Sequence, residues 1–165
     1  MIKVINKSVV DLPVDAIVNA ANKDLLWGGG VCGAIFSKAN DSGLIEECAR
    51  YAPIKIGEAI ITNAYNLKAK KIIHAVGPIY SGDKSDEVLL KSAYINSLDL
   101  CKNNNLHSIA FPCISTGIYG FPLKRASEIA VNSVKEWLNK NNDYDIEIIF
   151  ACYKDIEYQI YEALV

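Results

Sequence analysis

The sequence predicts one α/β domain over residues 1–165, built on a mainly parallel β-sheet with helices on both faces. Its length of 165 residues is near the usual size of one domain, and its 51% hydrophobic content can fill one sizeable core. Short β-branched runs alternate with longer segments in which apolar residues recur at helical spacing. Strands separated by helices are typical of a parallel sheet, because each parallel crossover places a helix on the sheet.

Six short runs rich in Ile, Val and Ala predict the strands, and several of them are apolar on both faces, as in a sheet covered on both sides. In chain order they are Ile2 to Ile5, Asp15 to Asn19, Glu58 to Asn63, Lys71 to Val76, Ser108 to Cys113 and Ile146 to Cys152.

Helical spacing of apolar residues predicts helices over Ser85 to Asn103, Pro122 to Leu138 and Asp155 to Leu164. Pro122 suits a first helical turn, where a missing N–H is no loss. A further helix follows the glycines at 28–30. The stretches 103–105 and 139–143, rich in Asn, predict helix ends and turns. No internal repeat or linker interrupts the pattern.

Charge and cysteine usage exclude several functional classes. The net charge is -2 and the basic residues are scattered, which disfavours electrostatic binding of nucleic acid. We find no signal-peptide pattern and no apolar run of the roughly 18 residues that a membrane span needs, so we expect a soluble, cytoplasmic protein. The five cysteines form no C-x-x-C pair, and we expect reduced, mostly buried thiols. With only His74 and His107 available, we expect no metal site.

Two glycine-containing loops are the strongest functional signal. The first, Asn19 to Ala39, contains Gly28, Gly29 and Gly30 immediately before a predicted helix, and exposed amides at a helix N-terminus form an anion site. The second, Ser115 to Gly120, also follows a strand and precedes a helix. Because ligands of open α/β sheets bind outside the carboxyl ends of the strands, the two loops can face each other across a pyrophosphate.

A dinucleotide-binding Rossmann domain is the rival interpretation, because Gly28, Gly30 and Gly33 match G-x-G-x-x-G. In that motif the glycines follow the strand directly, whereas eight residues separate Asn19 from Gly28 here. The acid expected about twenty residues later is also missing. We therefore interpret the match as accidental.

Four segments together resemble the macrodomain family. They are Asp15 to Asn22, with the sequence DAIVNAAN, the glycine loop Gly28 to Gly33, the strand Ile72 to Pro78 and the loop Pro112 to Gly120. They occur in the family's order and span most of the chain. The resemblance implies a three-layer α/β/α fold with a mixed, mainly parallel sheet. It is closest to the branch that removes ADP-ribose from modified carboxylates and deacetylates O-acetyl-ADP-ribose.

The resemblance implies roles at matching positions. Asn22 would hold the distal ribose hydroxyls, and the loop from Ser115 through Thr116, Gly117 and Ile118 to Tyr119 would wrap the phosphates. Tyr153 would lie against the adenine. A carboxamide offers a donor and an acceptor to a diol, and an aromatic ring stacks on a base. The remaining implied ligand contacts are Ser8, Val9, Asn19, Gly29, Gly30 and Val31.

Two of these positions have alternative interpretations. Asn19 is as suited to tying down its own loop as to touching ligand. Tyr119 follows a glycine turn, which favours a role in the cleft over packing. His74, by contrast, lies mid-strand among apolar residues and is expected to be a core histidine rather than a catalyst.

The sequence departs from the family pattern in three places. Where the hydrolase branch carries an aspartate and, four residues later, a histidine, this chain has Cys32 and Phe36. Near the N-terminus the usual Gly-Asp-Ile is absent and Ser8 stands nearby. Ser8 can accept a hydrogen bond from the adenine amine, although without a charge the bond is weaker. Asp11 is the alternative partner.

We therefore expect a macrodomain that binds ADP-ribose or an ADP-ribosylated protein and hydrolyses mono-ADP-ribosyl esters on acidic residues or O-acetyl-ADP-ribose. No cofactor is expected, and nucleic acid enters only as a carrier of ADP-ribose. The expected catalytic contributors are Asn22, Gly30, Cys32 and Tyr119. A non-catalytic module that reads ADP-ribosylation is the alternative.

Overall fold

A six-stranded sheet in the order β1-β6-β5-β2-β4-β3 forms the centre of the computed structural model, which describes residues 1–165. All neighbouring strands pair parallel except β3 and β4, which pair antiparallel. The predicted mixed, mainly parallel sheet is confirmed. The strands are β1 (Ile2–Ile5), β2 (Ala16–Ala20), β3 (Ala59–Asn63), β4 (Lys71–Ala75), β5 (Ser108–Phe111) and β6 (Glu147–Ala151).

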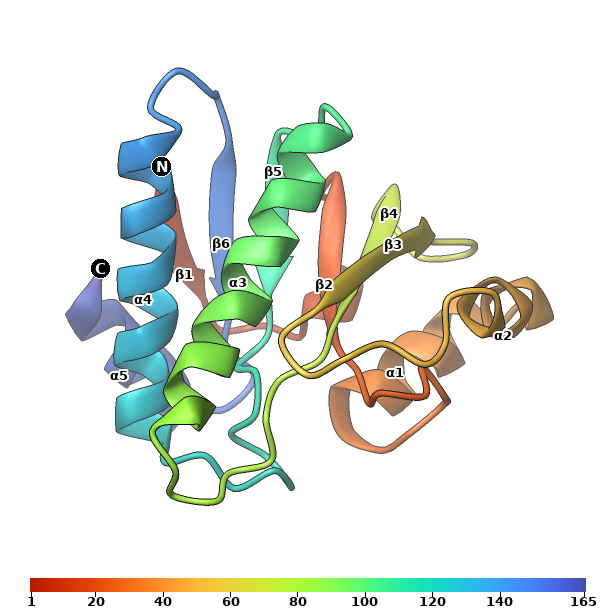
Figure 1. The fold of residues 1–165 in the computed structure, drawn as a ribbon. Helices are drawn as coiled ribbons and strands as arrows, with labels where there is room; N and C mark the ends of the chain where they lie inside the picture. Colours follow the sequence, from red (N-terminus) through yellow and green to blue (C-terminus); the bar gives the residue numbers. More distant parts are fainter.

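Helices cover both faces of this sheet and complete three layers (Figure 1). One face packs on α3 (Ser85–Asn103), α4 (Leu123–Lys140) and α5 (Asp155–Leu164). The other packs on α1 (Gly30–Ala39), α2 (Ser42–Ala49) and the short 3-10 helix η1 (Val9–Asp11). The two cores contain 24 and 21 buried residues, so neither face of the sheet is left to solvent.

Predicted and observed elements differ mainly at their ends. The bounds of β1, α3 and α5 agree with the prediction, and the other strands begin or end one or two residues inside or beyond it. Pro122 caps α4, which begins at Leu123. The sequence analysis missed α2, although Asp41 gives a start signal: its carboxylate accepts a hydrogen bond from the Gly43 amide at 2.8 Å.

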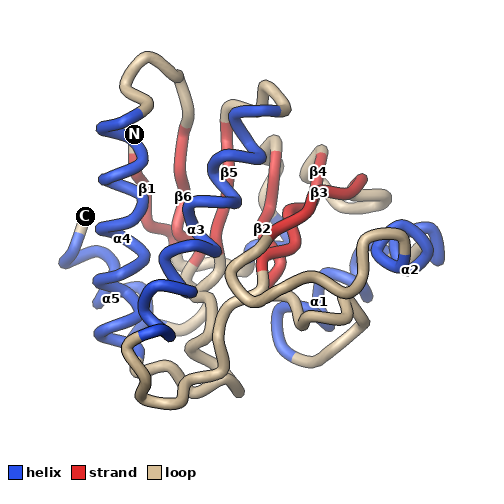
Figure 2. Tube along the Cα trace, viewed as in Figure 1, coloured by secondary structure: helices blue, strands red, loops and turns tan.

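The carboxyl ends of the parallel strands meet at one edge of the sheet, and the loops that follow them gather below the sheet in Figure 2. This edge brings together segments that are more than 100 residues apart in the chain, including the loops after β2, β5 and β6. None of the helices combines the length and the hydropathy needed to cross a membrane. All five cysteines are free, and four of them are buried.

Candidate functional site

A cleft of about 710 Å³ opens at the carboxyl edge of the sheet. Its volume falls within the range of about 300–1,000 Å³ that is typical of ligand pockets. Every residue that the sequence analysis assigned to the site lies in the wall of this cleft, with the exception of Asn19. The residues so placed are Ser8, Val9, Asn22, Gly29, Gly30, Val31, Cys32, Ser115, Thr116, Gly117, Ile118, Tyr119 and Tyr153.

The glycine loop forms one wall, where backbone rather than side chain faces the cleft. Gly29 caps α1, and Gly30 opens the helix with φ +57, a left-handed conformation that glycine adopts without strain. A Cβ added at either residue would meet no atom within 4 Å. The first amides of α1 have no partner within the helix and are available to an anion.

The Asn22 side chain stabilises this wall through two hydrogen bonds to the Leu26 backbone. Its side-chain Nδ2 donates to the Leu26 carbonyl at 2.9 Å, and its Oδ1 accepts from the Leu26 amide at 3.1 Å. The two bonds close the turn that leads into the glycine loop. A carboxamide has two N–H groups and two acceptor sites, so one of each remains for a ribose hydroxyl.

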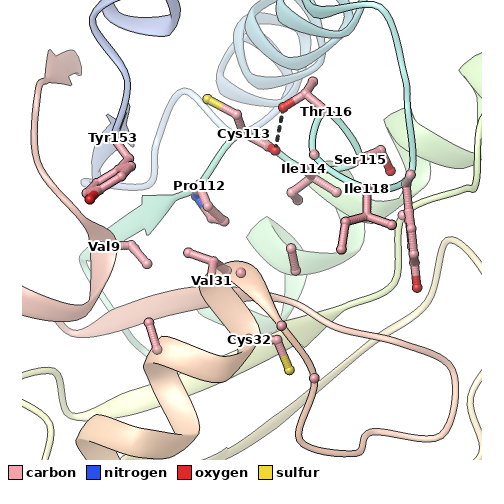
Figure 3. A pocket seen from close by; sticks show the side chains of 18 of the residues that line it. Val9, Val31, Cys32, Pro112, Cys113, Ile114, Ser115, Thr116, Ile118 and Tyr153 are labelled. Atoms are coloured by element: carbon pink, nitrogen blue, oxygen red, sulfur yellow. Dashed lines mark hydrogen bonds between the residues drawn. The ribbon is translucent and has the colours of Figure 1, made fainter.

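The loop after β5 forms the opposite wall and is held by its own hydrogen bonds, of which Figure 3 draws the one between Thr116 and Cys113. The Thr116 hydroxyl donates to the Cys113 carbonyl at 3.0 Å, the Phe121 amide donates to the Ser115 carbonyl at 2.9 Å, and the Gly120 amide to the Gly117 carbonyl at 3.0 Å. A Cβ at Gly117 would meet no atom within 4 Å. The loop therefore presents a fixed backbone surface to the cleft.

The segment after β4 forms the third wall, and its Gly77 allows the loop after β5 to approach closely. A Cβ at Gly77 would overlap the Ser115 Oγ and lie 2.6 Å from the Ile114 Cγ2. No side chain fits at position 77 unless the loop after β5 moves. The close approach therefore requires glycine at this position.

The end of the cleft near β6 has an aromatic side chain and a serine. The Tyr153 side chain is 75% exposed, which leaves its ring face available to a planar ligand. Ser8 lines the cleft, and its Oγ accepts from the Val10 amide at 3.4 Å. Asp11 lies outside the cleft wall, where it forms an ion pair with Lys38 at 3.5 Å. Ser8 is therefore the side chain placed at this end, and Asp11 is not.

Cys32 lies in the cleft wall, in the first turn of α1 after the glycine loop, and is only 5% exposed. Its thiol donates to the Leu26 carbonyl at 3.4 Å. Burial raises the pKa of the Cys32 thiol, and hydrogen bonds from the Gly28 backbone and the Asn19 side chain offset only part of that rise. Cys32 is thus a neutral thiol near pH 7, although it begins a helix. Phe36, one turn later, is 3% exposed and packs against the Trp27 ring at 5.6 Å.

Asn19 lies behind this wall in a buried polar network instead of in the cleft. Its Nδ2 lies 3.0 Å from the His74 Nδ1 and 3.8 Å from the Cys32 Sγ. The other nitrogen of His74 lies 2.9 Å from the Thr62 hydroxyl. His74 is fully buried, and this desolvation lowers its pKa to about 3. The prediction that His74 is a hydrogen-bonded core residue is confirmed.

The sequence analysis missed several residues of the cleft wall. They are Ala20, Ala21, Ala34, Gly77, Pro112, Cys113, Ile114, Ala151, Lys154 and Glu157. Most of them lie at the end of a predicted strand or within two residues after it, and that position was the signal that could have found them. Lys154 and Glu157 come together at the start of α5, where the Lys154 amide donates to the Glu157 carboxylate at 2.9 Å.

The fold and the cleft define a three-layer α/β/α domain with a nucleotide-sized cavity walled by backbone at the carboxyl edge of its sheet. The Macro domain family profile matches residues 18–130, which include the glycine loop, β4 and the loop after β5. The chain belongs to the Macro domain family.

Similar proteins carry names that concern ADP-ribose. The chain is 49% identical over 153 residues to the human ADP-ribose glycohydrolase MACROD2, a match that covers 92% of this chain and 36% of the human protein. It thus spans about a third of that relative's length. It is 44% identical over 168 residues to an O-acetyl-ADP-ribose deacetylase of Citrobacter rodentium, covering 99% of this chain and 94% of the relative.

Solved structures of the family match the fold closely. The Trypanosoma brucei macrodomain in complex with ADP-ribose superposes with a TM-score of 0.92 at 39% identity, covering 98% of this chain and 68% of the other. The Oceanobacillus iheyensis macrodomain with ADP gives a TM-score of 0.91 at 35% identity, covering 98% and 87%.

Proposed function

We propose that this protein binds ADP-ribose in the cleft and releases it from mono-ADP-ribosyl esters of acidic side chains or from O-acetyl-ADP-ribose. The observation that carries the proposal is the pair of backbone-walled loops that face each other across one cavity, with Asn22 on one wall and Tyr153 at the far end. This order fits a distal ribose, a pyrophosphate and an adenine. The names of the relatives support both the ligand and the reaction.

In the proposed binding mode, amides of the α1 N-terminus and of the loop from Ser115 to Tyr119 contact the pyrophosphate. The Asn22 carboxamide holds the distal ribose hydroxyls with the N–H and the acceptor site that Leu26 leaves free. Tyr153 stacks on the adenine, and the Ser8 hydroxyl accepts a hydrogen bond from its amine.

The proposed mechanism is substrate-assisted. On O-acetyl-ADP-ribose, a water held between the pyrophosphate and the glycine-loop backbone attacks the acetyl carbonyl carbon, and acetate separates from the ribose oxygen, which takes up a proton. On a mono-ADP-ribosyl ester, the same water attacks C1″ of the distal ribose and passes a proton to a phosphate oxygen. The C1″–oxygen bond to the carrier breaks, and the carboxylate leaves with the bonding electron pair. Asn22, Gly30 and Tyr119 fix the approach of the water, and such positioning supplies most of the rate acceleration. Cys32, a neutral buried thiol, orients the water without attacking C1″.

A second candidate is a module that reads ADP-ribosylation without turnover. The buried side chains of Cys32 and Phe36 favour it, because they stand where the hydrolase branch has a carboxylate and an imidazole. In either case we propose an ADP-ribosylated protein as the partner and the cytoplasm as the location, where five free thiols remain reduced.

A single-turnover release assay on an ADP-ribosylated acidic peptide distinguishes the two candidates. With enzyme in excess, the hydrolase releases ADP-ribose in a first-order reaction that Asn22→Ala slows. Calorimetric binding of ADP-ribose with no release above the buffer rate identifies the reader. No binding at millimolar ADP-ribose contradicts both candidates.

A further inference from the structure

The cleft crosses the carboxyl edge of the sheet from β6 to β4. Tyr153 follows β6 and Gly77 follows β4, and these strands are the two ends of the order β6-β5-β2-β4. Figure 3 shows Tyr153 and Cys32 on opposite sides of the pocket. Because the proposed binding mode places the adenine at Tyr153, the distal ribose lies towards β4. The carrier of an ADP-ribosyl ester therefore leaves the cleft at that end.

Four large apolar side chains are exposed to solvent beside this end of the cleft. Leu26 and Trp27 belong to the loop after β2, and Ile79 and Tyr80 belong to the loop after β4. Their exposed fractions lie between 42% and 63%. We call these four residues the apolar rim. Single exposed apolar side chains are normal, whereas a group of them beside a cavity marks an interaction surface.

Hydrogen bonds connect both halves of the apolar rim to the cleft wall. The Cys32 thiol donates to the Leu26 carbonyl at 3.4 Å, and the Tyr80 amide donates to the Tyr119 carbonyl at 2.8 Å. Cys32 and Tyr119 both line the cleft. The two loops leave neighbouring strands, because β2 and β4 pair in parallel. The apolar rim therefore borders the β4 end of the cleft from two loops.

The aromatic side chains of the rim are held from behind. The Trp27 ring packs against Phe36 with 5.6 Å between centroids, and the Tyr80 ring packs against Phe121 at 4.9 Å. Packing on one side limits the rotamers of these rings while part of each stays exposed. A contact with a fixed ring costs little conformational entropy, and aromatic residues are enriched at protein interfaces for this reason among others.

The charged residues next to the rim have both signs. Lys23 and Asp24 precede Leu26, Asp83 and Lys84 follow Tyr80, and all four are exposed. Their formal charges cancel, so the two loops create no field of a single sign that would select a basic or an acidic partner. Apolar contact therefore decides what this surface binds.

We propose that the apolar rim binds the polypeptide on either side of a modified carboxylate, and that the substrate is a protein with apolar side chains next to its ADP-ribosylated acidic residue. This inference rests on the proposed function and narrows it. The acetyl group of O-acetyl-ADP-ribose has a single methyl group and does not cover both halves of the rim. A polypeptide carrier gains contacts that the acetyl ester lacks, and such remote binding energy can be used in catalysis.

The experiment measures binding of two synthetic peptides by fluorescence polarisation. Each carries ADP-ribose at one position through a stable linkage that replaces the ester, so the readout does not depend on turnover. One peptide has leucines on both sides of the modified position and the other has serines. We expect the leucine peptide to bind about tenfold more tightly than the serine peptide, because its side chains bury apolar surface on the rim.

Variants on the two loops test the assignment of the surface. The measured quantity is the ratio of the two peptide affinities, because a change in the cleft itself affects both peptides equally. We expect Ile79→Ser and Leu26→Ser each to lower this ratio from about ten to about three. Val88→Ser is the matched control, since Val88 is 64% exposed but lies in a groove between α3 and α4, outside the cleft wall. It should leave the ratio unchanged.

Calorimetry with free ADP-ribose separates the two levels of the proposal. Equal affinity for the two peptides in a protein that binds ADP-ribose overturns the role of the rim and leaves the proposed function standing. An unchanged ratio in both Ile79→Ser and Leu26→Ser has the same meaning. A dimer in sedimentation that Ile79→Ser dissociates assigns the rim to a second copy of the chain and also overturns the proposal. No binding of ADP-ribose at millimolar concentration refutes the proposed function and the role of the rim together.

Discussion

Gly117→Glu tests the assignment of the phosphate wall directly. Gly117 is exposed in the cleft wall, and a Cβ there meets no atom within 4 Å, so the substitution is sterically tolerated. We expect the fold to survive and ADP-ribose binding to fall, because the new carboxylate would stand beside the pyrophosphate. Gly117→Gln is the matched control, since it has nearly the same size without the charge.

The size of the effect follows from the charges. A carboxylate about 6 Å from each of two phosphate charges, at an effective dielectric of about 40, opposes binding by roughly 3 kcal/mol in total. That corresponds to a loss of about a hundredfold in affinity, from a micromolar Kd to about 0.1 mM or weaker.

The assay is calorimetry of both variants with ADP-ribose at two salt concentrations, with thermal melts to verify folding. The penalty of the Glu variant relative to the Gln variant should shrink at high salt, because screening weakens exposed charge interactions. If the Glu variant binds within threefold of the Gln variant while both are folded, the phosphates do not lie beside Gly117 and the binding mode is wrong.

Four further predictions concern the ribose contact, the thiol, the adenine end and the core histidine. Asn22→Ala should lower the rate of ester hydrolysis more than tenfold in single-turnover assays, because it frees the turn at Leu26 as well as the ribose; an unchanged rate would contradict its role. Cys32→Ala should keep the rate of ester hydrolysis within about tenfold of the wild-type rate, or 1.4 kcal/mol of barrier. Cys32→Asp should raise that rate, because its carboxylate can orient the water. A trapped thio-ADP-ribosyl adduct on Cys32 would refute this mechanism. IDP-ribose should bind less than tenfold more weakly than ADP-ribose by calorimetry, because Ser8 offers an uncharged contact; a much larger difference would place an acid there. Burial gives His74 a pKa of about 3 in the folded protein, so between pH 6.5 and pH 3 only the unfolded state binds a proton at this residue. The free energy of unfolding should therefore fall by up to about 1.4 kcal/mol for each pH unit by which the pH is lowered. Urea titrations at several pH values should show this slope, and His74→Gln should flatten it.

Local sequence patterns predicted most helices and strands, because the periodicity of apolar residues that marks each of them extends over neighbouring residues only. The apolar periodicity of Ser85 to Asn103 and of Asp155 to Leu164 gave the bounds of α3 and α5 directly. The eight-residue helix α2 escaped because its buried Leu44 and Cys48 span a single turn, too short a window for a periodic signal. Its cap at Asp41 was the only strong local mark.

The candidate site was predictable where backbone carries the function. Glycines placed between a strand and a helix indicate a loop whose backbone amides bind an anion, and this pattern can be recognised in the sequence. Both loops predicted in this way line the cleft. The direction of individual side chains was harder to predict from the sequence. Asn19 and Asn22 are three residues apart in one motif, yet Asn19 at the end of β2 points to buried His74 while Asn22, past the strand, lines the cleft.

By itself the sequence determined the α/β class, the family resemblance, the two glycine loops and the loss of the usual aspartate and histidine at Cys32 and Phe36. Only the tertiary structure decided that Ser8 and not Asp11 enters the cleft, that Gly77 must stay small because Ser115 lies against it, and that Asn19 turns away from the cleft to His74. The reason is physical: periodicity and turn chemistry act over a few residues, whereas strand register and packing bring together residues far apart in the chain.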